Sequence, residues 1–339
     1  NQQVVLFAGP REYTYEVLLG RLAGGTHRLD VVRNGQFSAR ESGLDVLRLE
    51  TQPAAPGSEE ELIAEHAPIL LPRSGTLENF SDLPLLVYAE RFTGASGTLL
   101  RYSVVFSNED GGTSTRALMA RWGRPPAIEW AYEARLDQKG QRLAASFQGK
   151  GHEEMRYEGL FEGNQPILAA ETLNNMLVPA PALRLPAFRL APKLVRLVAA
   201  SREAVVDGAV FYRAMSEELD REGKLRPFGT RDGEKISDPR NYLYLELNVR
   251  NRGSAIAVWA RRQGDANARS SHLGDARLAV ERSGWARVAI EMPPGTKAAE
   301  IAEIGLLCEE LPKKHGAPQP PLEVDRVSKA FFLNQDYSP

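Results

Sequence analysis

The chain has 339 residues, of which 42% are apolar, and it carries 42 Lys and Arg against 44 Asp and Glu. These values are typical of folded soluble domains and exclude a disordered chain. Neither charge sign forms a run of five or more, so the sequence predicts no nucleic-acid partner. No apolar stretch approaches the roughly 18 residues of a membrane span.

The first residue and the cysteine content predict the compartment. The sequence begins at Asn1 rather than Met and contains one cysteine. We interpret this start as the product of a cleaved signal peptide or of trimming, and we expect a bacterial protein that is secreted or periplasmic. Cys308 lies in an apolar run, which predicts a buried, inert thiol.

The first eighty residues are predicted to contain strands and one short helix. The apolar runs 4–7 and 29–32 resemble strands, and Asn34-Gly35 is a hairpin signal. Ser58 followed by Glu61 is the pattern of a helix N-terminus, so a short helix is expected to run into Glu65.

The strongest strand pattern lies between residues 85 and 136. The segments 85–88, 99–106 and 128–136 are rich in apolar and aromatic residues and are separated by Gly-rich or Pro-containing breaks. In the last segment Glu129 shares one face with Glu133 and Arg135. Each strand therefore has an apolar side and a more polar side.

Four prolines between 178 and 192 predict an extended crossing between two domains, over residues 1–180 and 193–339. A helix is expected over 211–223, since Phe211, Met215 and Leu219 recur every four residues. Further strands are expected at 242–249, 254–260, 285–292, 302–308 and 327–333. The fold class is therefore mainly β, with two antiparallel β-sandwich or jelly-roll units and one or two short helices.

The densest group of acids follows the strand that ends at Phe106. Glu109 and Asp110 precede two glycines, where carboxylates can act as general acid and base or bind a divalent cation such as calcium. No cofactor is firmly implied, and a solvated turn is the alternative. Glu129 is the strand carboxylate expected to work with them if its face lines a cleft, and a surface charge if it does not.

Other side chains suit substrate binding. Trp122 and Arg124, before two prolines, resemble a rigid loop that presents a ring and a guanidinium, and Arg101 would help to position substrate. Asn174 and Asn175 could supply amide groups to a polar ligand, although paired Asn is also a routine turn.

Among the five histidines, His152 lies in a Gly-rich loop beside two carboxylates and is the candidate acid, base or ligand. His66 is the second candidate. An exposed or structurally hydrogen-bonded histidine is the alternative for each, and no recognised metal-ligand spacing joins them.

The order of elements between residues 82 and 152 resembles the vacuolar-sorting-associated (Vps-sixty-two-like) β-sandwich family. The similar segments are 82–88, 100–108 and 123–130, followed by the loop with His152. In that family a tyrosine-rich strand precedes a His-Gly-Asp-Trp-Glu type segment and a later histidine. Here Ala127 stands where the acid is expected, and Glu129 precedes Trp130. The resemblance implies a β-sandwich more than an activity.

Three functions are consistent with these patterns. The leading hypothesis is an exported enzyme that acts on a polysaccharide or oligosaccharide, as a hydrolase or lyase, with catalytic residues Glu129, Glu109, Asp110 and His152. The second is a noncatalytic glycan-binding or cell-envelope protein. The third is a copper- or iron-dependent oxidoreductase that uses His66 and His152.

Overall fold

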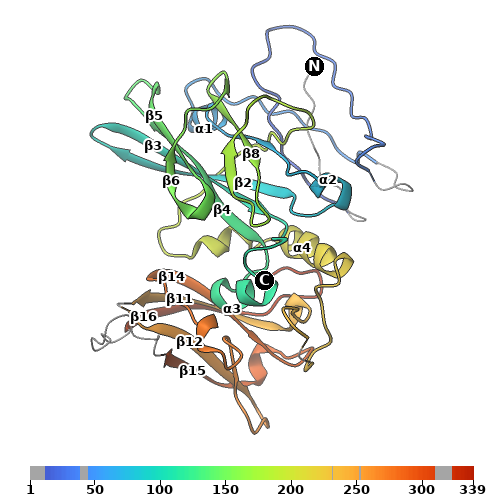
Figure 1. Ribbon diagram of the computed structural model, residues 1–339, viewed down its shortest axis with the longest axis vertical. Helices are drawn as coiled ribbons and strands as arrows, with labels where there is room; N and C mark the ends of the chain where they lie inside the picture. The colour runs from blue at the N-terminus through green and yellow to red at the C-terminus, as the bar shows by residue number, and fades with distance from the viewer. Residues whose placement is uncertain (1–11, 39–44, 231, 252, 310–322) are drawn as a thin grey trace. The chain divides into compact units, whose positions relative to one another are not determined.

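The computed structural model describes residues 12–38, 45–230, 232–251, 253–309 and 323–339. The chain divides into two compact units: unit 1 comprises Asn1–Phe106 and Ile128–Arg196, and unit 2 comprises Ser107–Ala127 and Leu197–Pro339. Strands predominate in both units (Figure 1), which confirms the mainly β prediction. Residues 107–127, which join two strands of unit 1, belong to unit 2.

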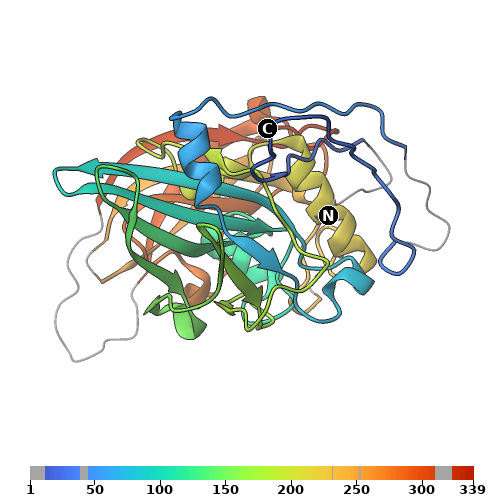
Figure 2. The ribbon, with the colours of Figure 1, turned by 90° about the horizontal axis from the view of Figure 1, so that it is seen from above.

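Unit 1 contains a six-stranded sheet with the order β10-β2-β3-β4-β5-β6. Its strands are β2 Pro84–Gly94, β3 Gly97–Phe106, β4 Ala127–Leu136, β5 Arg142–Gln148, β6 Glu154–Arg156 and β10 Lys193–Leu194. Both ribbon views show β2 and β3 as one long hairpin (Figures 1 and 2). Gly97 is required at its tip, because its φ is +128° and a Cβ there would lie 2.0 Å from the backbone oxygen of Leu136.

The second sheet of unit 1 is smaller. It contains β1 Ile69–Leu71, β7 Phe161–Glu162, β8 Gln165–Ala170 and β9 Leu177–Pro179, with β1 parallel to β8. Two short helices, α1 Glu59–Glu65 and α2 Thr76–Asn79, flank β1 in the sequence. Ser58 caps α1 by accepting a hydrogen bond from the amide of Glu61, as the sequence predicts.

The two faces of the six-stranded sheet have different roles. On one face Tyr102, Tyr132, Tyr157 and Phe147 pack ring against ring. Tyr102 donates a hydrogen bond to the carbonyl of Ile63 in α1, and Tyr157 accepts one from the amide of Ile167 in β8. This inner face therefore packs on α1 and the second sheet. The alternate residues point to the opposite side, which we call the outer face.

Unit 2 is built from two three-stranded sheets, with the orders β14-β11-β16 and β13-β12-β15. The strands are β11 Tyr242–Arg250, β12 Ala255–Arg262, β13 Arg269–Ser270, β14 Gly284–Glu291, β15 Ile301–Glu309 and β16 Glu323–Phe331. Buried aliphatic side chains from both sheets form one core cluster. The helices are α3 Thr115–Trp122 and α4 Ala209–Arg221, and α4 confirms the helix expected at 211–223.

Single turns of 3₁₀ helix complete the described structure. They are η1 Lys150–His152, η2 Arg202–Val206, η3 Pro239–Asn241, η4 Ala276–Leu278 and η5 Ala298–Glu300. No helix in the described part of the chain has the length and apolar character needed to cross a bilayer.

Three local predictions are wrong. Residues 29–32 form no strand, because the segment is mostly exposed and pairs with no strand in the described part of the chain, so no strand leads into the turn at Asn34-Gly35. Cys308 is exposed rather than buried, since β15 is the last strand of its sheet and leaves most of its side chains accessible. Trp122 ends helix α3 and is not in a loop. The strand expected at 4–7 lies outside the described residues.

Candidate functional site

Two of the residues singled out in the sequence lie together in unit 1. Gln148 at the end of β5 donates from Nε2 to Oε2 of Glu129 in β4, at 2.9 Å, and the same nitrogen is 2.6 Å from Nδ1 of His152. Nδ1 of His152 is 3.7 Å from the Glu129 oxygen. We call Glu129, Gln148 and His152 the His152 cluster.

Local structure explains this convergence. β4 and β5 pair antiparallel, with Tyr132 opposite Phe147, so Gln148 lies one position further along β5 and faces the other side of the sheet. The chain then turns through η1, where the amide of His152 bonds to the carbonyl of Gly149. His152 has a φ of +62°, a left-handed conformation that costs any residue other than glycine about 1 kcal/mol. Strain of this kind is concentrated at functional positions.

The hydrogen bonds define the proton positions in the His152 cluster. A carboxylate only accepts, so the Gln148 atom that contacts Glu129 must be its amide nitrogen. The second hydrogen of that NH₂ group points to His152, whose Nδ1 therefore accepts and whose Nε2 carries the hydrogen. The His152 side chain is 60% exposed, against 12% for Glu129. The cluster thus presents an imidazole donor to solvent above a largely buried carboxylate.

A second group on the outer face surrounds Arg101 in β3. Its guanidinium forms an ion pair with Glu133 through Nε and lies 5.7 Å from the ring centroid of Phe92 and 5.9 Å from that of Trp130. Glu90 is directly opposite Arg101 in the β2–β3 pair. We call Glu90, Phe92, Arg101 and Glu133 the Arg101 cluster.

The charges of the Arg101 cluster affect Glu90. Burial raises the pKa of Glu90, Arg101 opposes this increase, and the nearby Glu133 adds to it. Phe92 is 46% exposed although it is in a strand. The outer face therefore holds a carboxyl that takes up a proton more readily than usual, beside an exposed aromatic ring and a cation.

The two clusters share strand β4. Glu129 and Glu133 are four residues apart, which corresponds to about 13 Å along a strand. The predicted site residues Arg101 and Glu129 are therefore on one sheet of unit 1, and His152 is in η1, the turn that follows β5 of this sheet. The sequence did not identify Glu90 and Phe92 as site residues, because the alternation of a strand does not show which strand it pairs with.

The predicted acids Glu109 and Asp110 belong to unit 2. Glu109 is 6% exposed and accepts a hydrogen bond from the amide of Thr113, at 2.9 Å. Asp110 lies 3.6 Å from the ammonium group of Lys224. These contacts are those of an internally bonded turn in which Glu109 is buried rather than solvated.

Arg124 and Trp122 also belong to unit 2. Arg124 is 2% exposed, donates to the carbonyl of Pro126, and has its Nε 3.5 Å from Glu203. Burial alone would raise the pKa of Glu203, but Arg282, Arg202 and Arg124 together lower it to about 2. The ring of Trp122 has guanidinium groups of Arg121 and Arg282 at 5.9 and 5.8 Å from its centroid. Arg124 thus neutralises a buried carboxylate of its own unit.

Asn174 and Asn175 form a turn. The hydroxyl of Thr172 donates to Oδ1 of Asn174 at 2.6 Å, and the fully buried Asn175 has a φ of +59°. The turn places Met176 with its sulfur 3.7 Å from Nε2 of Gln148. This turn therefore contacts the His152 cluster through Met176.

His66 is fully buried, and burial lowers its pKa, with Glu65 opposing that effect. Within the described ranges, no group of three or more His, Cys, Asp or Glu side chains could hold a metal ion.

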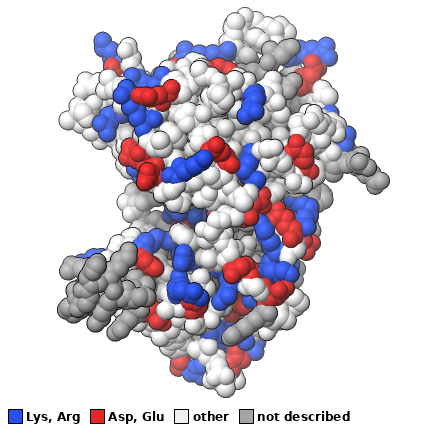
Figure 3. All heavy atoms as spheres, viewed as in Figure 1, with Lys and Arg blue, Asp and Glu red and all other residues white. Residues whose placement is uncertain are grey.

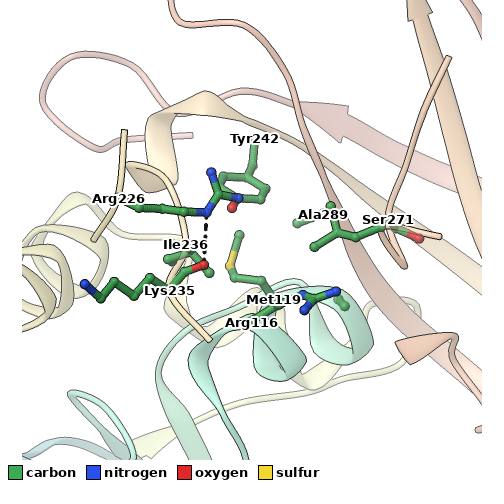
Figure 4. A pocket seen from close by; sticks show the side chains of 10 residues that line it. Arg116, Met119, Arg226, Lys235, Ile236, Tyr242, Ser271 and Ala289 are labelled. Carbon is green, nitrogen blue, oxygen red and sulfur yellow. Dashed lines mark hydrogen bonds between the residues drawn. The ribbon is translucent and has the colours of Figure 1, made fainter. Parts of the chain in front are cut away.

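Unit 2 contains a small cavity whose lining is mostly apolar (Figure 4). It is lined by Arg116, Met119, Ala120, Arg226, Lys235, Ile236, Tyr242, Ser271, Leu273 and Ala289. Arg226 donates to the carbonyl of Lys235 and pairs with Glu291 at 2.9 Å, so its charge is neutralised locally. The cavity has a volume of about 10 Å³, enough for a single water molecule.

Charged side chains of both signs are mixed over the face drawn in Figure 3, without a large area of one sign. This distribution agrees with the near balance of 42 basic and 44 acidic residues.

No protein-family model and no curated protein matches the chain. Two solved structures are similar to part of it: NLPPya in complex with mannosamine and NLPPya in complex with glucosamine. Each is 11% identical, with a TM-score of 0.31, and the match covers 56% of this chain and 89% of the other. A similarity of this degree carries no argument about function.

Proposed function

We propose that unit 1 binds carbohydrate on the outer face of its six-stranded sheet, at the Arg101 and His152 clusters. The observation that carries this proposal is the exposed Phe92 ring beside Arg101, on the sheet that also carries Glu129 and from which the turn with His152 extends. Sugar rings offer C–H groups to aromatic faces and hydroxyl groups to carboxylates, amides and imidazole nitrogens. The two clusters contain each of these partners.

Phe92 is the expected stacking residue. Nearly half of its surface is exposed, and the guanidinium of Arg101 lies 5.7 Å from its ring centroid. A ring that is already ordered loses little conformational entropy when a ligand covers it. We expect stacking on Phe92 to contribute about 0.5–1.5 kcal/mol.

The His152 cluster supplies the polar contacts. The exposed Nε2–H of His152 can donate to a sugar hydroxyl, and the tautomer that provides this donor is held by Gln148. Glu129 lies 3.7 Å from the same imidazole and can accept from an adjacent hydroxyl. A neutral polyhydroxyl ligand matches this alternation of donor and acceptor.

A matched pair of variants tests the binding proposal. Phe92→Ala removes a side chain that is 46% exposed, and Leu160→Ala removes one that is 48% exposed. The backbone of Leu160 is bonded to Tyr157, an inner-face residue, so this variant serves as the control. Retention on a panel of immobilised polysaccharides should fall two- to tenfold for Phe92→Ala and stay unchanged for Leu160→Ala. Equal retention of all three proteins would contradict the proposal.

The second candidate function is hydrolysis or elimination on the bound glycan. The raised pKa of Glu90 favours it, because a carboxyl that holds its proton more readily than usual is better suited to act as a general acid. Glu133, held by Arg101, would be the second carboxylate. Shortened polymer or unsaturated products in the wild type, lost in Glu90→Gln, would support this activity. A protein that retains glycan but releases no product is a binding protein only.

A further inference from the structure

A serine, a histidine and a glutamate of unit 2 form a continuous hydrogen-bonded series. Oγ of Ser270 is 2.8 Å from Nδ1 of His272, and Nε2 of His272 is 2.9 Å from Oε1 of Glu309. The sequence offers no spacing that suggests this group. The three side chains come from the sheet β13-β12-β15 and the turn that follows β13.

Strand pairing brings these residues together. On β12, Trp259 is opposite Ser270 of β13, and Ala255 is opposite Glu309 of β15. β12 therefore separates the serine from the glutamate, and the imidazole of His272 spans the distance between them. The His272 side chain is 8% exposed and that of Glu309 is 26% exposed, so the pair is partly shielded from water while Ser270 is half-buried.

The protons in this series can be assigned. The amide of Gly274 points at Nδ1 of His272 from 3.3 Å, and two N–H groups would repel there, so Nδ1 carries the lone pair. Nε2 then carries the hydrogen and donates to Glu309, and the Ser270 hydroxyl donates to Nδ1. Leu273, between His272 and Gly274, has a φ of +54°, a strained conformation that presents the Gly274 amide to the ring.

We propose that Ser270 is a nucleophile for small carboxylic esters, with His272 as its general base and Glu309 as the group that orients the imidazole. These are the roles of a serine–histidine–acid triad, which is defined by geometry and not by chain order. The proposal concerns unit 2 and is independent of glycan binding by unit 1.

The reaction follows from the assigned protons. Oγ of Ser270 attacks the ester carbonyl carbon while its proton moves to Nδ1, and Glu309 stabilises the resulting imidazolium. The C–O bond to the leaving alcohol then breaks, and the alcohol takes the proton from Nδ1. Water, deprotonated by the same nitrogen, hydrolyses the acyl-serine and regenerates the hydroxyl.

A fluorophosphonate probe on the full chain tests the nucleophile. The wild type should take up one probe per chain, and peptide mass spectrometry should place it on Ser270. Ser270→Ala should abolish labelling. Ser283→Ala is the matched control, because that hydroxyl donates to a backbone carbonyl and has no histidine partner, so labelling should be unchanged.

To test His272 as a general base, the labelling rate is measured together with the melting temperature, because a residue with only a structural role would change stability. General-base catalysis is worth about 10²- to 10⁴-fold, so His272→Gln should slow labelling at least a hundredfold. The His272 side chain is buried, so its replacement could also destabilise the fold. Glu309→Gln is therefore the second variant. We expect its labelling to slow about tenfold or more, with an unchanged melting temperature. An unlabelled Ser270 in the folded wild type, or wild-type labelling rates in both variants, would overturn the proposal.

Discussion

Gln148 Nε2 lies 2.9 Å from Oε2 of Glu129, and this bond connects the carboxylate of β4 to the imidazole of His152. Glu129 therefore does not face solvent as an isolated charge. Its environment depends on an amide that a single substitution removes.

Replacing Gln148 by Ala removes the donor shared by Glu129 and His152. A hydrogen bond to a largely buried carboxylate contributes about 1.5–3 kcal/mol, so we expect a loss of stability in this range. Glycan retention should also fall, because the His152 tautomer is no longer held. Urea unfolding and retention measured together check both effects, and a Gln148→Ala protein with wild-type values in both assays would contradict the geometry.

His152 has a left-handed backbone, and two substitutions separate that feature from its imidazole. His152→Gly should raise stability by about 1 kcal/mol, because glycine adopts a φ of +62° without strain. His152→Asn also tolerates this conformation and supplies a different polar group. Both should reduce glycan retention. Retention equal to the wild type in both variants would show that the imidazole does not contact glycan.

The buried carboxylate of Glu203 predicts a dependence of stability on pH. Its pKa in the folded protein is about 2, below the ordinary value near 4.3, so the protein binds this proton less readily when folded. The resulting stabilisation, about 3 kcal/mol, is complete above pH 5 and is lost as the pH falls towards 2. Urea unfolding measures the free energy of unfolding of the wild type and of Glu203→Gln at pH 6 and pH 3. The difference between the two proteins should be smaller at pH 3. A constant difference would contradict this prediction.

Arg287 is fully buried in unit 2, where it pairs with Asp207 at 2.6 Å and with Glu246 at 2.6 Å. Arg287→Ala removes the counter-charge of Glu246 and leaves Asp207 paired with Lys329 alone, so it should cost about 3–5 kcal/mol. Arg250→Ala breaks an exposed pair with Asp325 and is the control. Thermal unfolding should show a large decrease in Tm for the first variant and almost none for the second.

Cys308 is exposed on β15. A thiol reagent should therefore modify one cysteine per chain in the native protein without denaturant. Modification that occurs only after unfolding would contradict the exposure of Cys308 and would support the buried thiol that the apolar run Ile304–Cys308 predicted.

The sequence predicted most of the regular structure because the signals were local. The Ser58 cap, the four-residue spacing of Phe211, Met215 and Leu219, and the alternating strands of unit 2 all depend on neighbours in the chain. The prediction of a strand at 29–32 was wrong because an apolar run forms a strand only where a partner strand is available. The exposure of Cys308 depends on sheet order, which no local pattern shows.

The candidate site could be predicted only in part, for the same reason. Glu129 and His152 lie together because β4 pairs with β5, but Glu109 and Asp110 belong to the other unit. The Ser270–His272–Glu309 series depends on two strand pairings far apart in sequence. Export from the cell and membership of the Vps-sixty-two-like family stay predictions from the sequence.

Hydrogen exchange of the full chain, with and without a retained oligosaccharide, tests glycan binding by unit 1 most directly. We expect the ligand to slow exchange in the β2–β3 hairpin, in β4 around Glu129 and Trp130, and in residues 148–152. Protection by the oligosaccharide that is confined to unit 2, with these segments unchanged, would contradict a glycan site on the outer face.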